Sequence, residues 1–347
     1  MEQDRHFMKR CLQLAAMGTG RAAPNPLVGS VVVHNNSIIG EGYHQQCGGP
    51  HAEVNAIASV KHKELLSEAT IYVNLEPCAH FGKTPPCADL IVQHRLKRVV
   101  MANRDPFAQV DGRGIAKLKE AGIEVTTSVM EQEGAHLNRR FFTIHTHKRP
   151  NIIMKRAQSA DGFIDRHRNT ATQQKPLAIS GKESQRWVHQ WRSQEAGILI
   201  GSGTALLDNP RLDVRRWSGN SPVRLVLDRS GKLPVDLHLM DGSVRTMVFS
   251  ANQPKSDAVE WMPTSPTATL AEVMDQLYAQ NIQSILVEGG ATIHQQLLLE
   301  GLWDEARVWQ AEKLIGSGVP APTLPGKAHQ VHLVGKARCF TFYNAEV

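Results

Sequence analysis

Three metal-binding side chains that lie far apart in the sequence constrain the fold of this chain more than any other feature. His51 stands two residues before Glu53, Cys78 follows Pro77, and Cys87 comes after a short intervening loop. One imidazole and two thiolates suit zinc, and a catalytic zinc site keeps its fourth position open for water. The chain must therefore fold so that these three segments meet at one point.

Glu53 distinguishes a catalytic site from a structural one. Zinc lowers the pKa of a bound water, and a carboxylate that is not a ligand then has to move the protons. This order of ligands and glutamate is typical of zinc-dependent nucleobase deaminases. A closed structural site would need a fourth ligand, for which His44 and Cys47 are the nearest candidates in the sequence. A structural site has no use for Glu53, so we favour the catalytic interpretation.

Two neighbouring segments are candidates for substrate contact. Nucleobase deaminases usually place only two residues between the cysteines, whereas here the loop 79–86 separates them. In this polar, proline-containing loop, His80 and Lys83 are candidates for binding a phosphate or a pyrimidine. Asn25, in a turn before the first predicted strand, is a candidate hydrogen-bonding partner at the mouth of the pocket.

Length and composition predict a two-domain cytoplasmic protein. The 347 residues exceed one average domain, and 41% hydrophobic with 21% charged residues is ordinary for a globular chain. We find no apolar run of about 18 residues and no secretory signal. An odd number of cysteines, five, argues against a disulfide framework. The net charge of +6 suits a small phosphorylated substrate, and the basic residues are too dispersed to predict a nucleic-acid surface.

The first part of the chain alternates helical and strand patterns, which predicts a layered α/β domain over residues 1–146. The expected helices cover residues 4–17, 51–60, 89–94 and 114–121. The expected strands cover residues 28–34, 37–42, 70–75, 98–102 and 123–127. Basic residues and a proline at 145–150 mark the expected boundary.

The remaining residues, 147–347, repeat the alternation and predict a second α/β domain. Strands are expected over 151–155, 197–200, 223–228, 245–249, 284–287 and 306–310, and helices over 182–192, 270–280 and 292–299. Residues 254–269 are expected to form a surface connection. No G-x-G-x-x-G motif follows a strand, so a Rossmann site is not predicted. Gly289 and Gly290, between a strand and a helix, could instead admit a phosphate, as could the glycines of 201–211.

These motifs resemble those of the bifunctional riboflavin-biosynthesis deaminase/reductase family. The resemblance is carried by residues 25–29, 51–53, 75–78, 84–89, 104–106 and 112–114, and it continues through the second half. It implies a cytidine-deaminase-like three-layer domain followed by a dihydrofolate-reductase-like α/β domain. The first would deaminate 2,5-diamino-6-ribosylamino-4(3H)-pyrimidinone 5′-phosphate, and the second would use NADPH to reduce the ribosyl group to ribityl.

The resemblance also implies roles for single residues. One zinc ion per chain would be held by His51, Cys78 and Cys87, with Glu53 as the proton shuttle. The implied substrate contacts in the second half are Arg192, Leu212, Arg215 and Glu288. The implied contacts with NADPH are Ala157, Thr204, Asp208, Gly290, Ala291, Thr292, Ile293, His294, Gln295 and Gln296.

Three further expectations concern the second domain and assembly. Arg229, after the strand at 223–228, is a candidate for the 2′-phosphate of NADPH. Family members usually have a tryptophan where this chain has Ala178. Members are commonly dimers or tetramers, so we expect a homo-oligomer.

Two alternatives remain open on the sequence alone. The motif at His51 also fits a deaminase of tRNA or single-stranded nucleic acid, although aromatic residues for base stacking make up only 5% of the chain. The second half could also be a non-catalytic scaffold, an interpretation that Ala178 keeps open.

Overall fold

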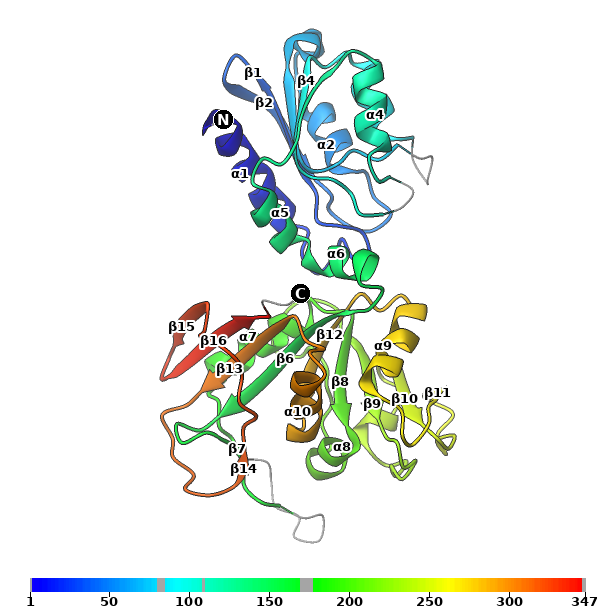
Figure 1. Cartoon of the computed structure of the whole chain (residues 1–347), viewed down its shortest axis with the longest axis vertical. Coiled ribbons are helices and arrows are strands. Elements are labelled where there is room, and N and C mark those ends of the chain that lie inside the picture. The colour runs from blue at the N-terminus through cyan, green and yellow to red at the C-terminus, as the bar shows by residue number, and fades with distance from the viewer. Residues whose placement is uncertain (1, 80–84, 108–109, 169–176, 345–347) are drawn as a thin grey trace. The chain divides into compact units, whose positions relative to one another are not determined.

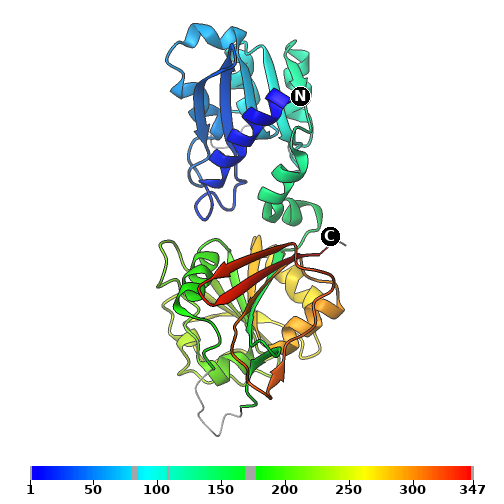
Figure 2. The ribbon, with the colours of Figure 1, turned by 90° about the vertical axis from the view of Figure 1, so that its left-hand side faces the viewer.

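The structure, a computed structural model, describes residues 2–79, 85–107, 110–168 and 177–344. It contains two compact units, Met1–His147 and Lys148–Val347, so the division lies one residue beyond the expected boundary. Each unit is a β-sheet covered by helices (Figures 1 and 2). Within the described ranges, no helix is both long enough and apolar enough to span a bilayer.

The first unit is built on a five-stranded sheet in the order β2-β1-β3-β4-β5. Strand β1 pairs antiparallel with β2 and β3, whereas β3, β4 and β5 run parallel. The strands are β1 (Gly29–His34), β2 (Ser37–Tyr43), β3 (Thr70–Leu75), β4 (Arg98–Asn103) and β5 (Glu124–Thr126). The helices are α1 (Glu2–Ala16), α2 (Ala52–Ser59), η1 (Lys63–Glu68), α3 (Cys87–Gln93), α4 (Arg113–Glu120), α5 (Glu131–Leu137) and α6 (Arg139–Thr146).

Strict alternation along the strands gives this sheet two buried faces. Val32 points into the core formed with α2, α3 and α4, while its neighbours Val31 and Val33 pack against α1. Gly29 lets α1 approach closely, because a Cβ at this position would lie 2.1 Å from the carbonyl oxygen of Cys11. The expected three-layer α/β arrangement is therefore confirmed.

The second unit is built on a nine-stranded sheet in the order β11-β10-β9-β8-β12-β6-β13-β16-β15. All pairs from β11 to β13 are parallel, and β16 and β15 add antiparallel strands at one edge. The strands are β6 (Asn151–Gln158), β8 (Gly197–Gly201), β9 (Val223–Leu227), β10 (Thr246–Ser250), β11 (Glu260–Pro263), β12 (Ser284–Gly289), β13 (Glu305–Gln310), β15 (Gln330–Val334) and β16 (Ala337–Tyr343). A separate pair joins β7 (Phe163–Asp165) and β14 (Val319–Pro320).

Helices cover both faces of the large sheet, as an open parallel sheet requires. One face packs against α9 (Leu270–Ala279) and α10 (Ala291–Leu299). The other packs against α7 (Lys182–Arg192) and α8 (Ser202–Asp208), and a short turn, η3 (His238–Met240), lies among its connections. Residues 254–269 were expected to form a surface connection. That expectation was wrong at β11, a strand in this segment that pairs with β10 through four residues.

Candidate active sites

The three expected zinc ligands come together at the ends of secondary structure elements. His51 directly precedes α2, Cys78 lies in the segment that leaves β3, and Cys87 is the first residue of α3. Their ligand atoms all lie within 4.8 Å of one another. The Nδ1 atom of His51 is 3.6 Å from Sγ of Cys78 and 3.3 Å from Sγ of Cys87. Zinc–sulfur and zinc–nitrogen bonds of tetrahedral geometry separate such atoms by roughly 3.5 Å, so the three residues fit zinc.

One of the two thiols, that of Cys78, sits where a thiolate is stabilised. Sγ of Cys78 accepts a hydrogen bond from the backbone N–H of Cys87, at a distance of 3.3 Å. Hydrogen bonding with the Cys87 thiol and with His51 lowers the pKa of Cys78. The helix dipole at the start of α3 favours negative charge at the same place. The hydrogen bond with Cys78 and burial raise the pKa of Cys87, so Cys78 is the thiol that is prepared as a thiolate for a divalent cation.

Within residues 2–79, 85–107, 110–168 and 177–344, the site does not acquire the fourth ligand that a structural zinc centre would need. Among the described residues, the metal-ligand group contains only His51, Cys78 and Cys87. His44 is engaged elsewhere, because its Nδ1 contacts the carbonyl oxygen of Pro50 at 3.0 Å and its Nε2 contacts Asn25 at 3.0 Å. An open coordination position is what a hydrolytic zinc site requires.

Glu53 lies in the first turn of α2 and is buried, with 3% of its surface exposed. Burial raises the pKa of Glu53 to about 7, and the nearby sulfur of Cys78 acts in the same direction. A carboxyl group with a pKa near neutrality can both accept and return a proton under working conditions. The side chain therefore has the environment of a general acid–base group, two residues from a zinc ligand.

A cavity of about 290 Å³ opens beside these residues. His51, Glu53 and Cys78 form part of its wall, and Asn25 and Asp105 contribute further polar groups. Its apolar walls include Val28, Leu75, Val110 and Phe141. The cavity combines an apolar enclosure with a few convergent polar groups, which is typical of small-molecule sites. The candidates His80 and Lys83 lie outside the described residues.

Two acidic residues of this site were missed by the sequence analysis. Glu76 is buried, and its carboxylate accepts backbone N–H bonds from Asp105, Gly112 and Ile115 at 3.3, 3.0 and 3.1 Å. Asp105 lines the cavity, and burial raises its pKa to about 7.

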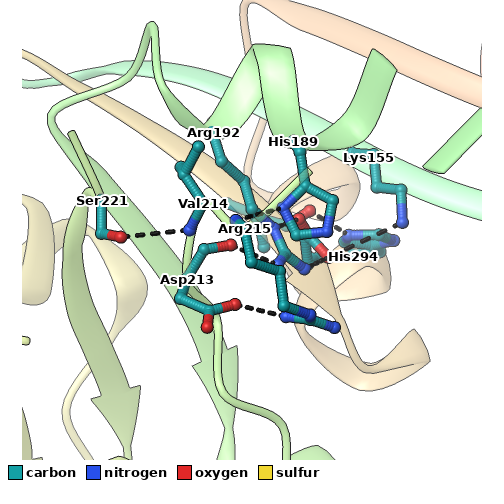
Figure 3. A network of polar contacts seen from close by, with 10 residues as sticks. Lys155, His189, Arg192, Asp213, Val214, Arg215, Ser221 and His294 are labelled. Atoms are coloured by element: carbon teal, nitrogen blue, oxygen red, sulfur yellow. Dashed lines mark hydrogen bonds and ion pairs between the residues drawn. The ribbon is translucent and has the colours of Figure 1, made fainter. Parts of the chain in front are cut away.

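The second unit carries a buried ion network at the carboxyl end of β12 (Figure 3). Glu288 forms a bidentate pair with Arg192, with distances of 2.7 and 2.8 Å. Lys155, on β6, lies 3.6 Å from the same carboxylate. Burial opposes ionisation, but the charges of Arg192 and Lys155 outweigh it and lower the pKa of Glu288 to about 2. Glu288 is therefore a permanent anion that joins α7, β6 and β12.

Four of the expected cofactor contacts line one groove of about 580 Å³ beside α10. They are Ala291, Thr292, Gln295 and Gln296. Gly290 caps this helix, and Gly289 adopts a φ of 136°, in a region that favours glycine. The N-terminus of α10 thus presents free backbone N–H groups beside a groove, as a pyrophosphate site requires.

The other expected cofactor residues differ in their contacts and in their burial. Thr204 adjoins Gly290, since its hydroxyl would lie 3.2 Å from a Cβ there. Arg229 reaches the same helix and donates to the Gln296 side chain at 3.4 Å. Asp208 pairs with Arg168 at 2.5 Å. Of the remaining three, Ala157 on β6 is partly buried, whereas Ile293 and His294 on α10 are buried and could meet a cofactor only through their backbone or after a side-chain movement.

The expected substrate residues of the second unit fall into two groups. Arg192 and Glu288 bind each other, while Arg215 is half-exposed and pairs with the neighbouring Asp213. Leu212 is buried in the core beneath α8, and its φ of 49° turns the chain toward Arg215. The structure thus brings these residues into one region of the second unit.

Comparisons with known proteins match each of the two units to a known domain. Residues 1–103 match the cytidine and deoxycytidylate deaminase zinc-binding region, and residues 150–341 match the RibD C-terminal domain. The riboflavin biosynthesis protein RibD of Escherichia coli is 37% identical over 93% of this chain and 92% of its own length. The RibD protein of Synechocystis is 37% identical over 94% of this chain and 89% of its own length.

The chain belongs to the RibD family. A solved deaminase/reductase of this family from Thermotoga maritima is 35% identical and has a TM-score of 0.89, with 99% of each chain covered. The protein is accordingly a bifunctional riboflavin-biosynthesis deaminase/reductase with a zinc-binding deaminase site. The full-length similarity favours this family over a tRNA deaminase, and it extends through the second unit.

Proposed function

We propose that the first unit hydrolyses the amino group of 2,5-diamino-6-ribosylamino-4(3H)-pyrimidinone 5′-phosphate, with Glu53 as the proton shuttle. The observation that carries this proposal is the buried Glu53 carboxyl beside an open His51-Cys78-Cys87 site. Zinc, when bound, lowers the pKa of the attacking water. Glu53 accepts a proton from that water as it attacks the amino-bearing carbon. The same carboxyl then delivers the proton to the leaving amino group, and ammonia departs.

The polar groups of the cavity suit an aminopyrimidine. Asn25 donates one amide hydrogen to Nε2 of His44 at 3.0 Å, which fixes the side-chain amide on the cavity wall. The Asp105 carboxyl on the same wall can bind an amino or ring N–H group. Phosphate binding by His80 and Lys83 in the loop between the cysteines completes the proposed substrate site.

We further propose that the second unit uses NADPH to reduce the ribosyl group of the deaminated product to ribityl. NADPH, when bound, supplies a hydride. The N-terminus of α10 and the groove along Thr292 and Gln296 would hold its phosphates, with Arg229 at the 2′-phosphate. Glu288 and Arg215 would contact the substrate. Because Lys155 and Arg192 already neutralise Glu288, this carboxylate can accept substrate hydroxyl bonds at little further cost.

Removing zinc should separate the two reactions. After chelation, we expect neither deamination of the diaminopyrimidine phosphate nor NADPH consumption from it, because the first step needs the metal. The chelated protein should still oxidise NADPH when it receives the deaminated product directly. NADPH absorbance, ammonia release and bound zinc measure the three quantities. Failure of the untreated protein to consume NADPH with the deaminated product would refute the proposed reductase reaction.

We also propose that the chain forms a homo-oligomer through the edge of the large sheet. Strand β15 ends this sheet, and its side chains Val331 and Leu333 are 55% and 75% exposed. In the part of the chain that the structure describes, β15 has a strand neighbour on one side only, and such an apolar edge strand is a template for pairing with a second copy. Light scattering should give at least twice the 38.3 kDa chain mass, and Leu333→Lys should yield monomers. A monomeric wild-type protein would contradict this assembly.

A further inference from the structure

A short segment of the second unit, residues 213–215, is fastened along its backbone by three different side chains (Figure 3). Arg192 donates to the carbonyl oxygen of the first residue at 3.0 Å. Ser221 accepts from the N–H of the second residue at 3.0 Å. His189 accepts from the N–H of the third, Arg215, at 3.3 Å. Each residue of the segment therefore has one backbone group held by a side chain from elsewhere in the fold.

His189 can form this bond only as a neutral ring. It accepts through Nδ1, so the proton of the neutral imidazole is on Nε2. The side chain is buried, with 4% of its surface exposed. Burial lowers the pKa of His189 to about 4, and the positive charges of Arg192 and Arg215 act in the same direction against Asp213 and Glu288. The acceptor is therefore available at neutral pH.

The direction in which the Arg215 side chain points is set by the position of its own backbone. The side chain is 52% exposed and pairs with Asp213 of the same segment, so its ion pair moves with the segment. On the preceding side, the buried Leu212 anchors the chain. On the Arg215 side, the bond to His189 holds the backbone itself, and the next side chain, Arg216, donates to Gln185 of α7.

We propose that His189 is a positioning residue of the reductase site, which sets the direction in which Arg215 meets the substrate. The proposal rests on the proposed function, in which Arg215 contacts that substrate. The same helix, α7, carries Arg192, which links Glu288 to the carbonyl oxygen of Asp213. One turn of α7 thus connects both proposed substrate contacts. The role predicts an effect on substrate binding rather than on hydride transfer.

Three substitutions of His189 distinguish positioning from packing. His189→Asn places an amide oxygen near the position of Nδ1, whereas His189→Gln carries the same amide one methylene further and His189→Leu has no acceptor. We expect the KM for the deaminated product to rise roughly fivefold in the Leu and Gln variants, the scale of one lost hydrogen bond. The Asn variant should keep a KM within twofold of wild type, and kcat should change little in all three.

Arg215→Ala, alone and combined with His189→Leu, separates this proposal from the function on which it rests. We expect the single Arg215 variant to raise KM, and the double variant to match it, because both changes remove one contact. An Arg215→Ala variant with unchanged KM would refute the proposed substrate role of Arg215. Two outcomes would overturn the His189 proposal alone, provided that Arg215→Ala raises KM. One is an unchanged KM in His189→Leu, and the other is a KM in His189→Asn as high as in His189→Leu. Zinc content and deaminase rate report an intact first unit, and the melting temperature reports folding of the second.

Discussion

Glu53→Gln should lower the deaminase kcat by roughly 10²–10⁴-fold, the usual contribution of a general acid–base group, while zinc stays bound. Glutamine preserves the size and polarity of the side chain but cannot accept the proton of the attacking water. Glu53 is not needed as a ligand, because His51, Cys78 and Cys87 supply the three that a catalytic site uses. Ammonia release under saturating substrate and zinc per chain are the two measurements.

Two controls make this result specific. The variant should reduce the deaminated product at the wild-type rate, since the second unit is unchanged. Glu64→Gln, at an exposed glutamate of the same unit, should leave both reactions intact. Loss of zinc together with activity in Glu53→Gln would instead show that Glu53 is a ligand or a structural support, and the shuttle role would have to be abandoned.

The zinc site could be predicted from the sequence because its chemistry needs particular residue types at particular spacings. Other parts of the site depend on contacts that spacing does not reveal. The helix predicted at residue 89 begins instead at Cys87, which places the second thiol in the field of the helix dipole. Glu76 supports the site through three backbone N–H groups that lie 29, 36 and 39 residues later in the chain. No local pattern indicates such a partner.

In the second unit, too, local sequence patterns predicted some features, whereas contacts between distant segments could not be predicted. Long apolar runs predicted its central strands, whereas β11 and β15 were missed because their side chains are mostly exposed and they belong to the edges of the sheet. The resemblance placed Leu212 at the substrate, but burial of its side chain leaves the backbone to act there. Arg192 and Glu288 were each expected to face the substrate. Their pairing across 96 residues of sequence appears only in the folded chain.

Glu288→Ala should destabilise the second unit by about 3–5 kcal/mol, because it leaves a buried cation without its partner. The Arg192 and Glu288 side chains are only 11% and 9% exposed, and Lys155 loses the same counter-ion. For a unit of this size, such a loss corresponds to a fall in melting temperature of roughly 10 °C. NADPH oxidation should also disappear, whereas the deaminase reaction of the first unit should persist below the unfolding transition.

An exposed pair of the same geometry provides the matched control. Arg245 binds Glu260 in bidentate fashion at 2.7 and 2.9 Å, but the two side chains are 46% and 47% exposed. Glu260→Ala should therefore cost less than about 1 kcal/mol, because water screens and replaces the pair. Comparable losses of stability in Glu288→Ala and Glu260→Ala would contradict the argument that burial makes the first pair more important.

Replacing both partners distinguishes the stability of the network from its function. In Arg192→Leu with Glu288→Leu, no unpaired charge remains from this pair, so much of the stability lost in Glu288→Ala should return. Reductase activity should not return, because the carboxylate at the end of β12 and the donor to the Asp213 carbonyl are both gone. Recovery of stability without reductase activity would show that the ion pair serves the reductase reaction rather than the stability of the unit. Recovery of both would show that Glu288 has no direct role at the substrate.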